Sequence, residues 1–397
     1  MHSQTSFKPV QKLLKMRCAG ATLLILLLSA CAGSDDEIKP AELVDFEPGI
    51  TVKRLWSTNL GKGGEGLLLG LAPASSGSKV YAASSDGKVA AFDTVSGALH
   101  WRTELGKQRG VAAGPGVGAE LVVVGTTDGE IIALAKDTGE VRWTSEVNSS
   151  VLAAPAVSTD GIAVRTVDGQ LKLLDINNGT EQWNVDRRIQ GLTLRGSSSP
   201  VFAANAVVSG FDNGKVAAFN VATGQVLWEQ SITERRGRNE LERLADVDGN
   251  LVIDGEDLYL VGFQGRAVLM SLRTGQPIWE QDMSSHNAVA VDWQHVYIST
   301  ADDELLALDR RNGLPVWKST DFAHRQLTGP VVVGSSVVVG DFEGYLHWLS
   351  VIDGQPQART RAGSAAIRAP LLAVGDIVYV QNDKGELHAF SKPTVVP

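Results

Sequence analysis

The stretch DGKVAAFD at residues 86–93, followed by Gly97 and Trp101, sets the pattern of this 397-residue sequence. Its glycine recurs every 38 to 51 residues, with one aspartate in its place, at Gly87, Gly129, Gly169, Gly214, Gly265, Asp303, Gly344 and Gly385. Ten residues after each of the first seven copies stands a second glycine: Gly97, Gly139, Gly179, Gly224, Gly275, Gly313 or Gly354. Four residues further on stands Trp101, Trp143, Trp183, Trp228, Trp279 or Trp317, and in the seventh copy Ala358. Strand-like segments and turn glycines at this period are typical of a propeller in which each repeat forms one blade.

Each repeat predicts four strands, as the third copy illustrates. We expect an inner strand at 151–157, a second at 162–167, a third at 170–175 and an outer strand at 181–185. A four-stranded sheet cannot bury both faces alone, so neighbouring blades must cover it. A tryptophan at one place in each outer strand supplies a large flat apolar surface for that contact. Because core tryptophans of an unrelated fold would not keep a constant phase, the sequence predicts an all-β, eight-bladed β-propeller of four-stranded antiparallel blades.

The two ends of the repeat region complement each other. Residues 55–58 look like an outer strand without the rest of its blade, whereas the eighth copy at 383–390 supplies a third strand and then stops. We therefore expect the N-terminal strand to complete the last blade, because closing the ring removes two exposed sheet edges. The propeller is predicted at 49–392, with a C-terminal tail at 393–397. Its structural docking residues are predicted to be Trp56, Trp101, Trp143, Trp183, Trp228, Trp279 and Trp317.

The first 30 residues are predicted to be a signal peptide. Four basic residues precede an apolar run at 19–28, which has the length of a secretory signal and is too short for an ordinary transmembrane helix. The residues LSAC at 28–31 resemble the lipobox of bacterial lipoproteins, which implies lipidation at Cys31; the alternative is a plain signal peptide. Within this resemblance, Ala32 favours the outer membrane. Residues 31–48, polar and acidic after Cys31, are predicted to be the lipidated flexible tether.

Composition excludes some functions. The formal net charge is −9, and an acidic surface of mixed charge argues against nucleic-acid binding. The second cysteine, Cys18, lies in the predicted signal, so the exported chain would have no internal disulfide.

Two connections between blades are longer than the rest. They follow Trp183 at 184–196 and Trp228 at 233–248, and each joins an outer strand to the next inner strand. Such connections lie on one face of a propeller, so these two are expected to form one patch beside the central channel, where loops on a rigid scaffold commonly bind partners.

The residue types in these connections suit a partner surface. Leu192 and Leu194 would point to the same side if extended, and Arg195 is of a type enriched at binding hot spots. Alternatively, the leucines seal the core, and Asp246 and Asp248 form a solvated acidic turn.

Other candidate sites are not supported. Asp246-x-Asp248-x-Asn250 begins like a calcium loop, but Leu251 occupies the required glycine position. The glycine-rich segment 114–118 is interpreted as a hairpin turn and not as a phosphate-binding loop. The histidines lack metal-ligand spacing, and no catalytic grouping stands out. We therefore predict no catalytic residues, metal or cofactor.

The repeat resembles the tryptophan-docking repeat of the quinoprotein propellers, with AFD at 91–93 and ALD at 307–309. Ala358 and Asp303 depart from that pattern, which puts local packing in doubt. One branch of this family consists of pyrroloquinoline-quinone dehydrogenases, many of which stack the quinone on a vicinal disulfide beside calcium. This sequence has no such cysteines, so a quinone-binding or sensor propeller is kept as the alternative.

The chain is more similar to the BamB family of outer-membrane lipoproteins, through its size, its lipobox and the segments LTLRG at 192–196, RLADVD at 243–248 and GDFEGYL at 340–346. The resemblance implies a non-catalytic scaffold of the β-barrel assembly (BAM) complex at the periplasmic face of the outer membrane. It also implies contact with the POTRA domains of BamA, indirect contact with other subunits, and contact with unfolded outer-membrane proteins. The implied partner-binding residues are Leu192, Leu194, Arg195, Asp246 and Asp248. A third hypothesis is a generic peptide-binding propeller.

Overall fold

The computed structural model describes residues 39–67, 69–106, 109–187, 198–233, 246–247, 249–392 and 394–395. Internal contacts divide the chain into two units, Met1–Lys39 and Pro40–Pro397, and the fold below is that of the second unit. The described residues form strands and turns and no helix. None of them, accordingly, belongs to a helix long and apolar enough to span a membrane.

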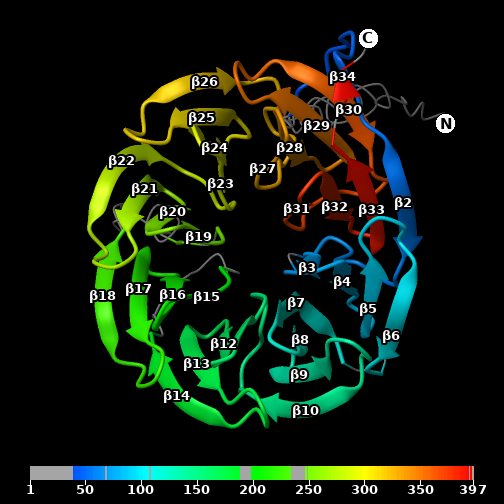
Figure 1. The fold of residues 1–397 in the computed structure, drawn as a ribbon. Coiled ribbons are helices and arrows are strands. Elements are labelled where there is room, and N and C mark those ends of the chain that lie inside the picture. Colours follow the sequence, from blue (N-terminus) through cyan, green and yellow to red (C-terminus); the bar gives the residue numbers. More distant parts are fainter. Residues whose placement is uncertain are drawn as a thin grey trace, which may run out of the picture. The chain divides into compact units, whose positions relative to one another are not determined.

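Eight four-stranded antiparallel sheets follow one another around a central opening (Figure 1). Blade 1 contains β3 (Ala74–Ser76), β4 (Lys79–Ala83), β5 (Lys88–Asp93) and β6 (Leu99–Glu104). Blade 2 contains β7 (Val111–Gly118), β8 (Leu121–Thr126), β9 (Glu130–Ala135) and β10 (Val141–Glu146). Blade 3 contains β11 (Ala156–Ser158), β12 (Gly161–Arg165), β13 (Gln170–Leu174) and β14 (Glu181–Asp186). Blade 4 contains β15 (Val201–Ala203), β16 (Ala206–Phe211), β17 (Lys215–Asn220) and β18 (Val226–Ser231).

The second half of the ring repeats this order from the inner to the outer strand. Blade 5 contains β19 (Val252–Asp254), β20 (Asp257–Val261), β21 (Gly265–Ser271) and β22 (Pro277–Met283). Blade 6 contains β23 (Ala290–Val291), β24 (His295–Ser299), β25 (Leu305–Asp309) and β26 (Pro315–Ser319). Blade 7 contains β27 (Val331–Val333), β28 (Ser336–Gly340), β29 (Tyr345–Ser350) and β30 (Pro356–Arg361). Blade 8 contains β31 (Leu372–Val374), β32 (Ile377–Gln381), β33 (Glu386–Ser391) and β2 (Arg54–Asn59).

The N-terminal strand closes the ring as predicted. β2 pairs antiparallel with β33, with Trp56 opposite Ala389, and lies at the outer edge of the last blade (Figure 1). A further pair outside the blades joins β1 (Ile50–Thr51) to β34 (Thr394–Val395). The predicted eight-bladed propeller is therefore confirmed, down to the strand that completes it.

The hydrophobic core lies between blades. One cluster combines Tyr81 and Val89 of blade 1 with Val122 and Ile132 of blade 2, and all four side chains are fully buried. The second and third strands of each blade are buried almost throughout, because both of their faces are covered by neighbouring blades.

In seven of the eight blades, a tryptophan docks the outer strand onto the next blade in the same way. Each indole Nε1 donates a hydrogen bond of 2.8–3.0 Å to a backbone carbonyl of the next blade, the acceptors being Thr94, Lys136, Ile176, Val221, Leu272, Arg310 and Val351. The ring also lies against the second repeat glycine, so a Cβ there would meet the indole at 2.4–2.9 Å. These glycines have positive φ angles, from +68° at Gly97 to +73° at Gly139. Close approach and backbone conformation therefore both require glycine at this spacing.

The inner strands are shorter than predicted. The strand expected at 151–157 is only β11, because the Val151 amide donates to the Thr126 carbonyl of blade 2 and Pro155 has no N–H to donate. The segment 114–118, interpreted as a turn, instead belongs to β7, and the chain turns at Ala119 with a φ of +43°.

Asp303 fits the turn position that is glycine elsewhere. Its φ is +60°, and its carboxylate accepts hydrogen bonds from the amides of Gln326 and Leu327 at 2.9 and 2.7 Å. Aspartate tolerates this conformation better than most residues, and its side chain here joins the turn to the following connection.

The docking contact can be tested with two glycines of similar φ. Gly179, at +73°, would place a Cβ 2.6 Å from Trp143, whereas Gly255, at +64°, has no atom within 4 Å of that position. Gly179→Ala is expected to lower the free energy of unfolding by roughly 2–5 kcal/mol, from overpacking plus backbone strain, and Gly255→Ala by about 1–2 kcal/mol from strain alone. Urea denaturation of both variants measures the difference, and equal losses would contradict the docking role.

A buried histidine makes stability depend on pH. His388 is 5 % exposed, and among the described residues its ring nitrogens have no hydrogen-bond partner; burial outweighs the effect of Glu386, 3.8 Å from Nε2, and lowers the pKa of His388. Below about pH 6.5 the unfolded chain binds a proton at this histidine that the folded chain does not. The free energy of unfolding therefore falls as the pH is lowered, by up to about 1.4 kcal/mol per pH unit. His388→Ile, which introduces the residue found as Ile132 at the same repeat position, is expected to flatten this decline.

Urea denaturation between pH 5 and 7.5 measures the decline, with exposed His100→Gln as the control. A decline of the same steepness in His388→Ile and the unsubstituted chain would contradict the assignment.

Candidate partner-binding site

The two long connections begin and end at neighbouring blades, and their ends are described. The first follows β14 of blade 3 and is described at Arg187 and again from Ser198. The second follows β18 of blade 4 and is described to Thr233 and again at Asp246. The parts between, 188–197 and 234–245, lie outside the described residues.

The ends of the two connections are bonded to each other. Near their beginnings, the Arg187 guanidinium lies 3.1 Å from Glu229 of β18, the strand that leads into the second connection, and Glu229 also pairs with Lys215 at 2.6 Å. Because Arg187 and Glu229 are about a quarter exposed and Lys215 is 42 % exposed, the ion pairs contribute modestly to stability.

Where the connections end, two hydrogen bonds join them. The Ser198 hydroxyl donates to the Gly249 carbonyl at 3.1 Å, and the Ser199 amide donates to Asn250 Oδ1 at 3.0 Å. The two connections therefore start side by side and return side by side, as expected for consecutive connections on one face of the ring.

A buried ion pair supports the blades below these connections. Arg165 of blade 3 and Asp212 of blade 4 are 2 % and 6 % exposed and are hydrogen-bonded to each other. The guanidinium also lies 5.5 Å from the centre of the Phe211 ring. Removing one member of such a pair leaves a buried charge and costs about 3–5 kcal/mol, so the pair holds blades 3 and 4 in register.

The predicted partner residues fall into two groups. Leu192, Leu194, Arg195 and Asp248 lie outside the described residues. Asp246 is described and is 1 % exposed, and its carbonyl accepts a 2.8 Å hydrogen bond from the Phe263 amide of blade 5. This burial does not fit a solvated turn at Asp246, and its contact with a partner stays a prediction.

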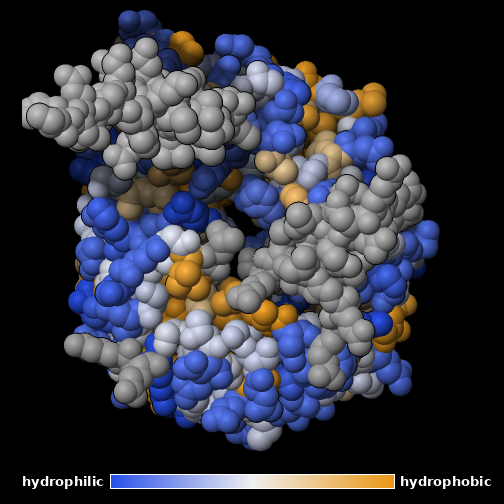
Figure 2. Space-filling model, turned by 180° about the vertical axis from the view of Figure 1, so that it is seen from behind, coloured by the Kyte–Doolittle hydropathy of each residue, from blue (hydrophilic) through white to orange (hydrophobic). Residues whose placement is uncertain are grey.

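Hydrophobic side chains gather at the rim of the central opening in the view of Figure 2. Leu67, in the connection from β2 to β3, is 65 % exposed. That connection reaches across to blade 2, where the Gly70 amide donates to the Ala112 carbonyl at 2.8 Å. Sequence reasoning did not identify the exposed Leu67 or its connection, because this connection has no unusual length or residue pattern.

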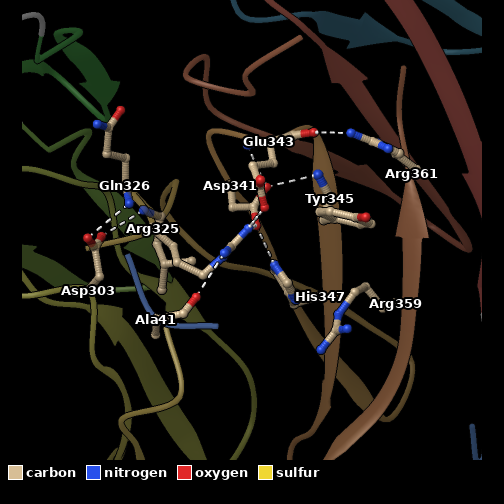
Figure 3. Close-up of polar contacts among 12 residues, drawn as sticks. Ala41, Asp303, Arg325, Gln326, Asp341, Glu343, Tyr345, His347, Arg359 and Arg361 are labelled. Carbon is tan, nitrogen blue, oxygen red and sulfur yellow. Dashed lines mark hydrogen bonds and ion pairs between the residues drawn. The ribbon is translucent and has the colours of Figure 1, made fainter. Parts of the chain in front are cut away.

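A second polar cluster lies between blades 6 and 7 (Figure 3). Arg325 donates to Asp341 at 2.9 and 2.7 Å from Nε and Nη2, also pairs with Glu343, and donates from Nη1 to the Ala41 carbonyl at 3.0 Å. His347 Nε2 lies 2.9 Å from the same Asp341 oxygen. Sequence reasoning missed this cluster, because Arg325 and Asp341 are 16 residues apart and lie in different turns, Arg325 in the connection after β26 and Asp341 after β28.

The electrostatics of this cluster are those of a structural ion pair. Burial alone raises the pKa of Asp341, but hydrogen bonds with His347, the Tyr345 amide and Arg325 outweigh it and hold this pKa below its ordinary value. Burial lowers the pKa of His347, so a neutral imidazole donates to the carboxylate. Over the described ranges, no group of three or more His, Cys, Asp or Glu side chains is placed to hold a metal ion.

Comparison with known proteins gives consistent matches. A family profile described as outer membrane protein assembly factor BamB matches residues 44–112 and 106–319. The outer membrane protein assembly factor BamB of Pseudomonas aeruginosa is 40 % identical over 369 residues, which cover 93 % of this chain and 97 % of that protein.

Solved structures agree at the level of the fold. The crystal structure of BamB from Moraxella catarrhalis matches with a TM-score of 0.78 and 27 % identity, covering 86 % of this chain and 100 % of that one. A quinohemoprotein alcohol dehydrogenase from Comamonas testosteroni matches with a TM-score of 0.67 but only 16 % identity, over 87 % of this chain and 77 % of that one, which shows a shared fold alone. With a profile matching more than half of its length and a relative 40 % identical almost end to end, the chain belongs to the family of the outer membrane protein assembly factor BamB.

Proposed function

We propose that this protein is a non-catalytic scaffold of the outer-membrane β-barrel assembly complex, which binds the POTRA domains of BamA and assists the insertion of β-barrel proteins. The observation that carries the proposal is the 40 % identity to a named assembly factor over 93 % of this chain. The described ends of the two long connections support it, because hydrogen bonds join them beside each other on blades 3 to 5.

A scaffold needs a surface whose shape does not change when the partner binds. Seven indole–glycine contacts and the buried Arg165–Asp212 pair make the blades rigid, and loops on a rigid support bind with a smaller entropy cost. Leu192, Leu194 and Arg195 on the first connection and Asp246 and Asp248 on the second supply the apolar and charged contacts of this surface. The ring then orients the flexible POTRA domains.

Two further roles belong to the same proposal. Outer strands of the blades offer backbone groups to extended segments of unfolded outer-membrane proteins, which can pair with a sheet edge. Cys31 carries the lipid that anchors the protein at the periplasmic face of the outer membrane, where other subunits of the complex are reached indirectly.

The quinone-binding alternative has less support. The dehydrogenase similarity stands at 16 % identity and concerns the fold alone. The sequence contains two cysteines, Cys18 and Cys31, and therefore no vicinal pair on which a quinone could stack. An absorbance band after reconstitution with the quinone would reverse this preference.

The partner surface is tested by photo-crosslinking in intact cells. A photo-reactive residue at Leu194 is expected to give one dominant product that contains BamA, because this side chain would lie in the contact. The matched control is Ile352, which is 75 % exposed but lies in a turn that precedes an outer strand, at the opposite end of the blade from the connections.

Three other outcomes would count against the proposal. Absence of a product at Leu194 in a folded, lipidated protein would make this leucine a seal of the core. Equal capture of BamA from both positions would remove the assignment to one face. Capture of many envelope proteins without a dominant one would favour a generic peptide-binding propeller.

A further inference from the structure

The junction between blades 7 and 8 lacks both members of the docking pair. Ala358 of β30 stands where the other outer strands carry tryptophan, and Val395 stands ten residues after Gly385, where the other repeats carry glycine. At the seven regular junctions a Cβ on that glycine would lie 2.4–2.9 Å from the indole, so tryptophan and glycine require each other. Their joint loss at one junction indicates that another element closes it.

Residues just before the first blade strand lie at this junction. Ile50 pairs with Val395 in the β1–β34 ladder, and the Gly49 amide donates to the Gln357 carbonyl of β30 at 3.0 Å. The Ile50 side chain is 7 % exposed and packs in one core cluster with Ala358 of blade 7 and Phe390 of blade 8. Ile50 therefore adds an apolar contact to a cluster that also contains the fully buried Trp348 of blade 7 and Val380 of blade 8.

The preceding residues are fixed to blades 6 and 7 over their whole length. The Ala41 amide donates to the Ala323 carbonyl at 2.8 Å, and Ala41 in turn accepts from buried Arg325 (Figure 3). Further along, Arg359 donates to the Val44 carbonyl at 2.9 Å and its guanidinium lies 5.3 Å from the centre of the Phe46 ring. We call residues 41–51 the N-terminal strap.

The strap also borders a pocket of about 170 Å³ beside Ala358, lined among others by Phe46, Phe322, Trp348, Ala358 and Arg359. In place of the regular indole–glycine pair, closure here therefore involves the core cluster around Trp348 together with the β1–β34 ladder, Ile50 and the two arginine contacts.

We propose that the N-terminal strap is the eighth docking element of the ring, so that closure between blades 7 and 8 depends on the segment that leads to Cys31. Loss of the strap opens this junction before any of the other seven, because those keep their indole–glycine contacts. The segment that connects the ring to the predicted lipid thus also holds the ring closed. This inference is independent of the partner proposed above.

The test compares local opening in the full chain and in a strap variant, Gly49→Pro/Ile50→Asp. Proline removes the amide that donates to Gln357, and aspartate cannot stay in the apolar cluster. Hydrogen exchange of β30, β31 and β33 is expected to accelerate on the order of ten-fold or more, with blade 3 unchanged. Unchanged exchange at the junction, or equal acceleration in all blades, would overturn the proposal.

A milder variant covers the case in which the double substitution does not fold. Arg359→Met removes the hydrogen bond to Val44 and the contact with Phe46 while keeping an aliphatic side chain. It is expected to accelerate exchange at the same strands by a smaller factor. Acceleration confined to blade 3 would contradict the proposal.

Discussion

The contact between one indole ring and one glycine of the next blade is the interaction on which this structure depends. A single blade buries neither of its faces, so its stability comes from its two neighbours. The indole stabilises the contact in two ways. It covers apolar surface of the next blade, and it donates a hydrogen bond to a backbone carbonyl that would otherwise be buried without a partner. Because the chain closes into a ring, weakness at any junction exposes the apolar faces of two blades, which makes the weakest junction important for the whole domain.

Most of the fold could be predicted because this contact leaves a pattern in the sequence. The constant spacing from Gly97 to Trp101 and its repeats predicted the blades, and the N-terminal strand without a blade predicted β2 beside β33. The inner strands were predicted less well, because hydrogen bonds to the neighbouring blade, as at Val151, replace pairing within the blade. The residue pattern of one repeat does not show whether a backbone amide pairs within its own blade or with the neighbouring blade.

The candidate site was predictable only in outline. Connection length indicated which loops lie together, and the bonds from Arg187 to Glu229 and from Ser198 to Gly249 fit that indication. The Arg325–Asp341–His347 cluster was not predictable, because its members come from separate segments and each residue is ordinary on its own. The same holds for residues 41–48, whose acidic composition predicted a free tether although Phe46 and the backbone of Ala41 and Val44 contact the ring. Their flexibility remains a prediction, but from Ala41 onward these contacts limit it.

The strap relates the position of the ring to the proposed anchor. It begins at Ala41, beside Ala323 and Arg325 in the connection that follows β26, and connections that follow outer strands share the face of the two long ones. Ten residues separate Cys31 from Ala41, a span of at most about 35 Å when fully extended. A chain fixed only from Val52 onward would reach about 70 Å. If Cys31 carries the proposed lipid, fixing the strap to the ring thus about halves the reach of the tether.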